Sequence, residues 1–352
     1  MDEIHNSDNT LRSRVDGYGF DRSDDQHAEA IDKFMASYLS ILARRASRWN
    51  NLLSSGERIS KNRKLKRFCR KGIPNEHRKT MWMLLSGAEE KRKANPRTYR
   101  LLLDSQKDER VVETIALDLH RTFPENIFFS SEDGLQRPLR NVLVAASLYN
   151  PDKGYSQGLN FIAGLLLLIV KDEENVFWLM DSLMNNILPD FYSPGMEAVR
   201  AEQELLGEII RSVSSLFKIE STMLLIWKDR ELHDHIQEVG VQWCLVGTKW
   251  FMCLFADVLP TETVLRIWDC LFFEGNKVLL RVSTLLILQN KERLMACNNF
   301  QEMVAEIQEV IKNPKSLNCH KLMKHCFKKL GSFPTTRIEK MRQECLMRVG
   351  EQ

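Results

Sequence analysis

Apolar side chains at helical spacing constrain the fold of this chain more than any other feature of its sequence. Val111, Ile115 and Leu119 stand four residues apart, and this spacing gives a helix one apolar face. A longer stripe of the same kind comprises Val264, Leu265, Trp268, Leu271 and Phe272. Only 16 glycines and 10 prolines occur among the 352 residues, about 7% against a usual share of about 12%, so turn-forming residues are scarce. The sequence therefore predicts an all-α fold.

Residues that start and stop helices mark several of the predicted elements. Pro74 is expected to start a helix that ends at Gly87, Asp108 to start another, and Thr261 to start one that ends at Gly275. Further helices are predicted from Leu159 and over 173–187, 278–295 and 300–311, whereas the chain after Lys328 is basic and less patterned. The apolar run over 161–170 is about half as long as the roughly 20 residues of a membrane span, so it predicts a buried helix.

The first 69 residues differ from the rest of the chain and form a predicted N-terminal flank. Residues 1 to about 27 are polar and expected to be loose. From Ala28 an amphipathic helix is predicted to dock on the main domain through a stripe made of Ile31, Phe34, Met35, Tyr38, Leu39 and Leu42. A basic stretch follows, made of Lys61, Arg63, Lys64, Lys66, Arg67, Arg70 and Lys71. It forms either a solvated linker or helix face, or a surface that attracts anionic membranes with ~1 kcal/mol per charge.

Charge and cysteine content argue against several classes of protein. The formal net charge of +3 gives no reason to expect a nucleic-acid partner. The eight cysteines contain no C-x-x-C pair, and the acidic N-terminus lacks the pattern of a signal peptide, so we expect reduced thiols and a cytoplasmic location. Cys319, His320, His325 and Cys326 do not fit a zinc site, because only the cysteines share a helix face and they lie about 10 Å apart along it. Without a phosphate-binding loop or a catalytic triad, the chain is expected to bind neither metal nor nucleotide.

Two short motifs carry the candidate functional residues, and the first has the form I-x-x-D-x-x-R over Ile115, Asp118 and Arg121. Because three residues advance a helix by about 300°, Ile115 faces the core, Asp118 lies at the edge of the buried face and Arg121 points outward. Pro124 disfavours helical geometry at Phe123, which leaves Arg121 on the last turn, where Asp118 can hold its guanidinium. Alternatively, Arg121 only stabilises the helix C-terminus, by ~0.3–1 kcal/mol.

The second motif, Tyr155-Ser-Gln157-Gly158, follows a predicted turn over 150–154 and leads into the helix from Leu159. Gly158 allows another stretch of backbone to come close, and Tyr155 can pack or hydrogen-bond beneath the loop. The Gln157 carboxamide both donates and accepts hydrogen bonds, as does the group that orients the attacking water in a GTPase. Alternatively, Gln157 caps its own helix.

These motifs, with Arg78-Lys-Thr-Met-Trp82 upstream and Trp268-Asp269 downstream, resemble the TBC domain, a family of GTPase-activating proteins for Rab GTPases. The resemblance covers about residues 70–275 and implies a two-lobed helical domain. The flank 1–69 precedes it, and a helical extension over 276–352 completes the second lobe and the tail. Arg78 and Trp82 share a helix face and have a structural role in the family. The flanks, including Asp16-Gly-Tyr-Gly-Phe20, resemble one branch of this family.

The resemblance also implies a mechanism. Arg121 is then an arginine finger that neutralises charge on the leaving phosphate oxygens, and Gln157 takes over in trans the water-orienting role of the GTPase's own glutamine. The expected partner is a GTP-bound Rab that brings GTP and Mg²⁺, so the chain needs no cofactor and regulates an enzyme without being one. It would act in vesicle trafficking, in the cytoplasm and peripherally at endomembranes. The alternative is a binding module that docks a Rab and recruits other factors without accelerating hydrolysis.

Overall fold

The computed structural model describes residues 15–21, 25–56, 59–216, 230–312, 318–331 and 333–350. Most of the segment predicted to be loose, residues 1 to about 27, lies outside these ranges, as does the side chain of Ile31. Within the described ranges the regular structure is helical, and β-type pairing is limited to isolated bridges from Val15 to Asp21 and from Phe20 to Asn126. The predicted all-α class is confirmed.

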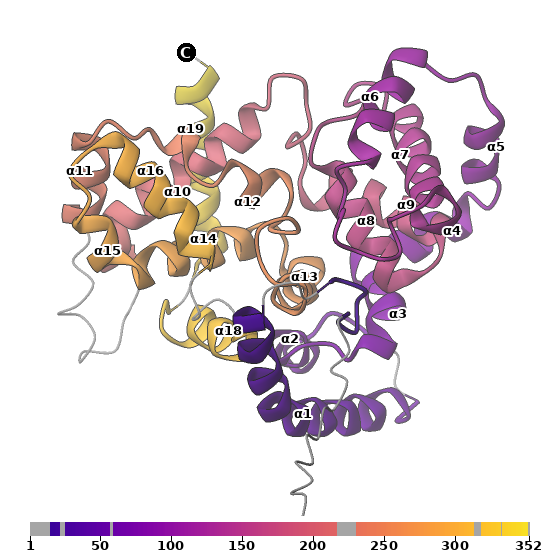
Figure 1. Ribbon diagram of the computed structural model, residues 1–352, viewed down its shortest axis with the longest axis horizontal. Coiled ribbons are helices and arrows are strands. Elements are labelled where there is room, and N and C mark those ends of the chain that lie inside the picture. Colours follow the sequence, from indigo (N-terminus) through magenta and orange to yellow (C-terminus); the bar gives the residue numbers. More distant parts are fainter. Residues whose placement is uncertain are drawn as a thin grey trace, which may run out of the picture.

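The first lobe is coloured purple to magenta in Figure 1. Its elements are α3 (Asn75–Ser86), α4 (Ala88–Ala94), α5 (Thr98–Asp104), α6 (Glu109–Leu119), the π-helical turn η1 (Glu132–Gln136), α7 (Arg137–Tyr149), α8 (Leu159–Val170), α9 (Glu173–Ser182) and the π-helical turn η2 (Leu183–Ile187). Helix α7 is central and packs against α5, α6, α8 and α9. All of α8 except Phe161 is buried, as its apolar run predicts.

The second lobe is coloured pink to yellow in Figure 1. Its elements are α10 (Glu197–Leu216), α11 (Arg230–Glu238), η3 (Trp243–Leu245), α12 (Thr248–Met252), α13 (Thr261–Glu274), α14 (Lys277–Gln289), α15 (Lys291–Met295), α16 (Phe300–Glu309), η4 (Val310–Lys312), α18 (Cys319–Lys328) and α19 (Thr335–Gly350). Helix α10 packs against α11, α14 and α19. In the part of the chain that the structure describes, no helix combines the length and apolar character needed to cross a bilayer.

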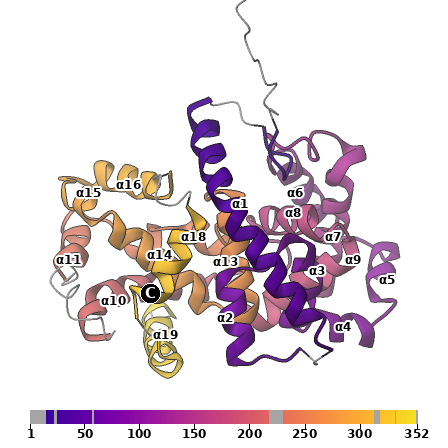
Figure 2. The same ribbon diagram turned by 90° about the horizontal axis from the view of Figure 1, so that it is seen from below.

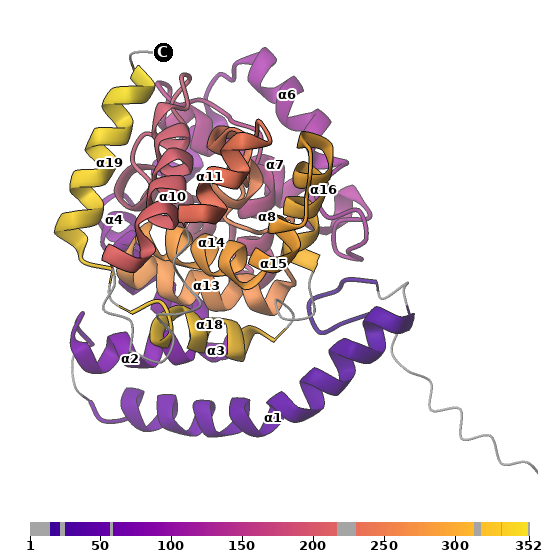
Figure 3. The same ribbon diagram turned by 90° about the vertical axis from the view of Figure 1, so that its left-hand side faces the viewer.

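The N-terminal flank contributes α1 (Asp25–Leu53) and α2 (Arg63–Lys71). Figures 2 and 3 show α1 lying across one side of the molecule, against α2 and α3. Trp49 Nε1 donates to the Gly72 carbonyl at 2.9 Å, and the Tyr38 hydroxyl accepts from Arg266 Nη1 at 3.2 Å. The helix therefore docks on the main domain, as the sequence predicts.

The predicted apolar stripe of α1 is wrong at Leu39, which is 60% exposed. The buried face runs instead through Tyr38, Arg45 and Trp49, because steps of seven and four residues return a helix to within about 40° of its starting direction. Leu39 is rotated about 100° from Tyr38 and so points toward solvent. A charged residue, Arg45, thus occupies a buried position in this helix.

The basic stretch forms α2 and is a helix face rather than a linker. Leu65 and Cys69 are buried on its inner side. Arg70 makes a two-pronged ion pair with Glu274 of α13, with N–O distances of 2.6 and 2.8 Å, and Lys66 Nζ lies 3.1 Å from the same carboxylate. Although burial alone would raise it, these cations hold the pKa of Glu274 below its usual value. Two of the basic residues therefore attach α2 to α13.

A buried carboxylate on α13 joins this helix to the first lobe. Asp269 is fully buried; it accepts hydrogen bonds from the Ile73 amide at 2.9 Å and from Trp82 Nε1 at 3.0 Å. The buried Arg78 guanidinium lies 3.3 Å from the same carboxylate. Trp268, beside Asp269 in the chain, packs on Trp82 with 6.0 Å between ring centroids. Arg78, Trp82, Trp268 and Asp269 therefore meet in the core.

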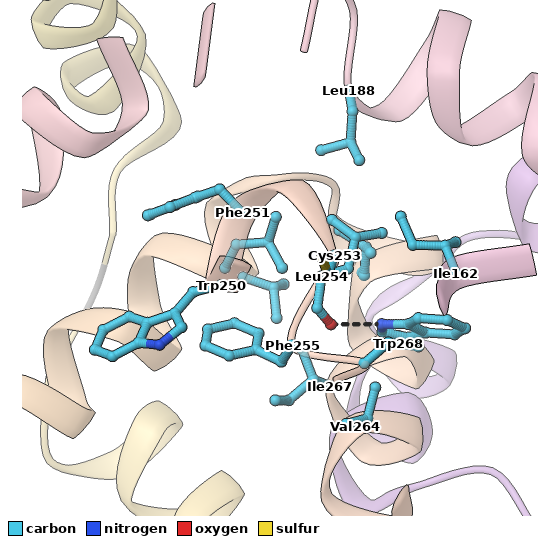
Figure 4. Packing of buried hydrophobic residues seen from close by; sticks show 14 of the residues in the cluster. Ile162, Leu188, Trp250, Phe251, Cys253, Leu254, Phe255, Val264, Ile267 and Trp268 are labelled. Carbon is cyan, nitrogen blue, oxygen red and sulfur yellow. Dashed lines mark hydrogen bonds between the residues drawn. The ribbon is translucent and has the colours of Figure 1, made fainter. Parts of the chain in front are cut away.

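Trp268 also fixes the turn that follows α12, which Figure 4 shows from close by. Its Nε1 donates to the Leu254 carbonyl at 3.0 Å. Leu254 and Phe255 both have left-handed backbone, with φ of 50° and 66°, a conformation that costs ~1–3 kcal/mol for each such residue. Ile162 of α8 and Leu188 reach the same cluster from the first lobe. Packing across the lobes thus holds a turn that would not be stable alone.

The observed helix ends agree with most predictions, but the helix predicted over 278–295 is divided at Asn290 into α14 and α15, and the C-terminus also differs. Helix α3 ends at Gly87, in left-handed conformation, and α13 ends at Gly275. The chain after Lys328 is more regular than its sequence suggests, because α19 packs along α10 and buries Ile338 and Cys345. Ile338, Met341, Cys345 and Val349 recur in α19 at steps of three and four residues, a helical stripe that the intervening basic residues obscure in the sequence.

We predict that Asp269→Ala lowers the free energy of unfolding by about 3–5 kcal/mol, because it leaves the buried Arg78 charge without its main partner. The measurement is denaturant unfolding followed by circular dichroism. The control is Asp104→Ala, which removes an exposed carboxylate at the end of α5 and should change stability by less than about 0.5 kcal/mol. An Asp269→Ala protein as stable as the control would contradict the proposed role of this carboxylate.

Candidate functional site

The two predicted motifs meet in one open groove of about 880 Å³. Its walls comprise α6, the segment over 151–158, the loop over 193–196 and the segment over 248–257 of the second lobe. The groove therefore runs along the junction between the lobes, and both Arg121 and Gln157 line it. In Figure 1 it lies between α6 and α12, on the side of the molecule away from α1.

Arg121 lies just beyond the end of α6, in a turn shaped by Phe123 and Pro124. The helix ends at Leu119, slightly earlier than predicted, and Phe123 has left-handed backbone with φ of 50° directly before Pro124. Half of the Arg121 side chain is exposed, and its Nη2 lies 2.6 Å from Asp118 Oδ1. Asp118 thus holds one terminal nitrogen of the guanidinium, while Arg121 lines the groove.

Asp118 links the first motif to the second. It is buried rather than at the edge of the helix face as predicted, and Ile115 one turn earlier is fully buried beneath it. The Tyr155 hydroxyl donates to Asp118 Oδ2 at 2.5 Å. Burial first, and then the Asp118 charge, raise the pKa of Tyr155, so this hydroxyl remains a proton donor. One carboxylate therefore orients Arg121 with one oxygen and anchors the second motif with the other.

Gln157 is exposed in the groove at the start of α8. The alternative in which it caps this helix is not observed, because the N-cap is Gly158 and no side chain caps it. Gly158 has left-handed backbone with φ of 110°, and a Cβ there would lie 3.2 Å from the Met252 carbonyl oxygen. A glycine is needed at this position because the second lobe approaches so closely. The Gln157 carboxamide therefore lines the groove without capping its own helix.

A buried chain of hydrogen bonds ties the turn after α6 to the start of α8. Thr122 Oγ1 donates to the Asp118 carbonyl at 2.6 Å, and Asn160 Nδ2 donates to Thr122 Oγ1 at 2.8 Å. Asn160 Oδ1 in turn accepts from the Gly158 amide at 3.0 Å. The two turns that carry Arg121 and Gln157 are therefore parts of one hydrogen-bonded unit.

Residues 15–21, which we call the N-terminal strap, hold the turn after Arg121 from outside. The Ile127 amide donates to the Gly19 carbonyl at 3.0 Å, and the Asp21 amide donates to the Glu125 carbonyl at 2.9 Å. The Phe20 ring packs edge-on against Phe123, with 5.4 Å between centroids. Sequence analysis did not assign this role to the strap, because its partners are more than 100 residues away in the chain.

Lys249 brings a further positive charge to the groove, besides Arg121 and Lys153, and sequence analysis did not single it out. Its Nζ lies 2.9 Å from Asp257 Oδ2, and both residues line the groove. The hydrogen bond to Asp257 raises the pKa of Lys249. No motif marks this lysine in the sequence, since only the turn after α12 brings Asp257 back to it.

The four signature residues Arg78, Trp82, Trp268 and Asp269 do not line the groove. They lie in the core, where they hold α3 against α13. Among the residues that the structure describes, no group of three or more histidine, cysteine, aspartate or glutamate side chains is arranged to hold a metal ion.

An all-helical, two-lobed fold with an exposed arginine and glutamine in the groove between its lobes is the architecture of a Rab-GTPase-TBC domain. The family model RabGAP-TBC, described as the Rab-GTPase-TBC domain, matches residues 75–295. The chain belongs to this family.

Individual relatives resemble the chain over nearly its whole length. Growth hormone-regulated TBC protein 1-A of Danio rerio is 44% identical over 349 residues, which cover 98% of this chain and 94% of that protein. Growth hormone-regulated TBC protein 1 of Homo sapiens is 41% identical over 338 residues, 96% of each chain. The crystal structure of the Chlamydomonas flagellar RabGAP TBC domain superposes with a TM-score of 0.75 at 28% identity, covering 90% of this chain and all of that one. The branch that the flanks resemble is the growth hormone-regulated one, and this prediction is confirmed.

We predict that Phe20→Ala loosens the turn that follows Arg121. Edge-on aromatic pairs contribute ~0.5–1.5 kcal/mol, so amide hydrogen exchange over residues 122–129 should become up to about tenfold faster through local opening. Leu117→Ala, a truncation at an exposed position on α6, is the control and should leave these amides unchanged. Equal exchange rates in the wild type and in Phe20→Ala would show that the strap does not hold the turn.

Proposed function

We propose that this chain accelerates GTP hydrolysis by a GTP-bound Rab GTPase, by inserting Arg121 and Gln157 into the nucleotide site of the partner. The observation that carries the proposal is that a guanidinium and a carboxamide extend from two linked turns into one open groove. Membership of the Rab-GTPase-TBC domain family supports the same class of partner. The chain would then be a regulator that completes the active site of another protein.

Arg121 would neutralise the charge that develops on the phosphate oxygens of the partner. Half of its side chain is exposed while Asp118 is buried, so the guanidinium can turn toward a phosphate but leaves a buried carboxylate behind. The Tyr155 hydroxyl donates to Asp118, so this buried carboxylate keeps a hydrogen bond when Arg121 turns away. Asp118 and Tyr155 would thus position Arg121 without touching the nucleotide.

Gln157 would orient the attacking water. A carboxamide accepts a hydrogen bond from water through its oxygen and donates one through its NH₂ group toward the γ-phosphate. Gly158, packed against Met252, fixes the backbone beside Gln157, so little ordering entropy remains to be lost when the partner binds. This role would replace that of the partner's own glutamine.

The remaining parts of the proposal follow from this chemistry. GTP and Mg²⁺ would come from the partner, and the chain would carry no cofactor and bind no nucleic acid. Residues 70–275 would form the activating unit, supported by the flank 1–69 and completed by 276–352. We propose that it acts in the cytoplasm and peripherally at endomembranes, in vesicle trafficking, because Rab substrates are found on membranes. The exposed Arg63 and Arg67 of α2 would add weak attraction to anionic lipid.

A docking module that binds a Rab without accelerating hydrolysis is the second candidate. Such a module needs the shape of the groove but neither the Arg121 nor the Gln157 side chain. Two side chains make up only a small part of a protein–protein interface. Both fingertips are present and exposed in this chain, which favours the catalytic candidate.

We predict that Arg121→Ala lowers the stimulated hydrolysis rate by roughly 10³–10⁵-fold, the usual contribution of an arginine finger. Arg121→Lys should fail almost as completely, because an ammonium lacks the planar fork of a guanidinium. The measurement is single-turnover hydrolysis on a responsive Rab, found by screening a panel of GTP-loaded Rabs. Arg110→Ala, at an exposed position on the same helix, is the control and should keep full activity. Full activity of Arg121→Ala would leave the docking module as the better account.

We predict that Gln157→Ala lowers the stimulated rate by roughly 10²–10³-fold, comparable to loss of one preorganised hydrogen-bonding group. Binding to a Rab loaded with a non-hydrolysable GTP analogue should change little. If Gln157 supplies the carboxamide, mutating the Rab's own switch glutamine should leave much of the stimulated rate. Loss of all stimulation in that Rab variant would show that the partner's glutamine orients the water. Gln301→Ala, at an exposed position on α16, is the matched control.

A further inference from the structure

A second cavity, which we call the basic pocket, lies on the opposite side of the molecule from the groove. It has a volume of about 620 Å³ and is enclosed by α1, α2 and α18. Figures 1 and 3 show these three helices on the side away from α6. The pocket is within the usual size range of small-molecule sites, about 300–1,000 Å³. A ligand bound there would leave Arg121 and Gln157 accessible.

Positive charge is concentrated at this pocket. Arg44, Arg45, Arg48 and Lys71 line it, and no acidic residue does. Arg44, Arg48 and Lys71 are exposed, and none of the three lies within ion-pair distance of a carboxylate on a described residue. By contrast, Lys66 and Arg70 on the same α2 helix share the negative charge of Glu274. The pocket therefore combines four positive charges with no carboxylate among the residues that line it.

Arg45 adds a buried charge that this chain leaves incompletely satisfied. It is 6% exposed, and its Nη2 donates to the Tyr38 hydroxyl at 2.6 Å, but its Nη1 is buried without a hydrogen-bond partner. No carboxylate among the described residues forms an ion pair with it. The Glu262 carboxylate attracts this charge from beyond ion-pair distance, and burial still lowers the pKa of Arg45. A buried charge that is satisfied this incompletely carries a desolvation penalty, which an anion in the pocket would reduce.

The electrostatic environment of His320 agrees with this picture. His320 lines the pocket from α18. Burial first, and then the nearby Arg266 and Arg45 charges, hold the pKa of His320 below its usual value. The imidazole is therefore neutral near pH 7 and leaves the positive charge to the arginines and the lysine.

The remaining walls of the pocket are apolar. The Trp49 and Phe68 rings pack edge-on, with 5.5 Å between centroids, and Ile41 lies beside them. Trp49 is fixed by its hydrogen bond to the Gly72 carbonyl. Trp49 is itself almost fully buried, whereas Ile41 and Phe68 remain partly exposed. An inorganic anion alone would leave the Ile41 and Phe68 surface uncovered, whereas an apolar group on the same ligand would bury it at about 25 cal/mol per Å².

We propose that the basic pocket binds a phosphate ester that carries an apolar group, with its phosphate near Arg44, Arg48 and Lys71 and its apolar part against Ile41 and Phe68. The arginine forks match phosphate geometry. The phosphate can belong to the headgroup of a membrane lipid or to a soluble ester, because the recognition chemistry is the same. The proposal does not depend on the GTPase-activating function, since the pocket and the groove share no residue.

The test compares four probes on the full chain. They are phosphatidylcholine vesicles with and without a polyphosphoinositide, a short-chain water-soluble polyphosphoinositide, its headgroup without acyl chains, and inorganic phosphate. Vesicle binding is measured by co-sedimentation, and binding of the soluble probes by titration calorimetry. We expect the short-chain lipid to bind more tightly than the bare headgroup, and inorganic phosphate to bind weakest. Binding to polyphosphoinositide vesicles alone would identify a membrane lipid as the ligand. Binding of the short-chain lipid in solution with the same affinity as the vesicles would identify a soluble ester.

Three variants connect binding to the pocket. Arg44→Glu with Arg48→Glu should lower affinity by roughly tenfold or more, since each charge near the ligand contributes about 1 kcal/mol. Arg97→Glu with Arg100→Glu changes the net charge equally at exposed positions near α5, and should change affinity little. Arg45→Met removes the buried charge and should lower affinity while the thermal midpoint stays at or above that of the wild type, because no carboxylate on a described residue lies within ion-pair distance of Arg45 to offset its burial.

Specific outcomes would overturn the proposal. Equal losses in the α1 and α5 double variants would reduce the effect to general electrostatic attraction. Failure of every probe to bind, or full affinity in Arg45→Met, would exclude the pocket as a phosphate site. The Arg44→Glu, Arg48→Glu protein is also tested in the Rab hydrolysis assay, where it should retain full activity. A loss of phosphate binding can then be distinguished from a loss of GTPase activation.

Discussion

The rest of this structure depends on the buried carboxylate of Asp269. A charge without solvent is stable only when neighbouring groups satisfy it, and here the Ile73 amide, Trp82 and Arg78 do so. These three groups belong to the first lobe or to the segment leading into it, while Asp269 belongs to α13 of the second. The interaction therefore fixes the position of one lobe against the other. Both walls of the groove depend on that relation, because residues 151–158 and 248–257 face each other across it.

Asp118 has a comparable role at the edge of the groove. It accepts from Tyr155 and pairs with Arg121, and so connects two turns that are more than 30 residues apart in the sequence. Thr122 and Asn160 reinforce that connection, and the N-terminal strap holds the outer side of the turn. Two exposed polar side chains are thus carried by rigid supports. Such preorganisation is what allows groups to act in a partner's site without losing entropy on binding.

Much of the fold and part of the site could be predicted from local patterns. Helical spacing predicted the all-α class, Gly87 and Gly275 marked the ends of α3 and α13, and the two motifs singled out Arg121 and Gln157. Local sequence patterns gave wrong predictions where packing between distant segments determines which side chains are buried. Leu39 fits an apolar stripe but is exposed because Arg45 and Trp49 define the docked face of α1. Helix α19 was missed for a different reason: basic residues obscured the helical spacing of Ile338, Cys345 and Val349, although these residues form the buried face of a helix that packs on α10. The interior position of Asp118 was also underestimated.

The sequence by itself determined where many of the helices form and which two motifs carry Arg121 and Gln157, because both depend on residues within a few positions of one another. Only the tertiary structure decided which groups meet. The pair of Lys249 with Asp257, the contact of the strap with residues 123–127 and the basic pocket between α1, α2 and α18 all join distant parts of the chain. Their geometry follows from how the lobes and the flank pack. A helix-forming pattern does not specify that packing, because it identifies the apolar face of a helix but not the element that covers this face.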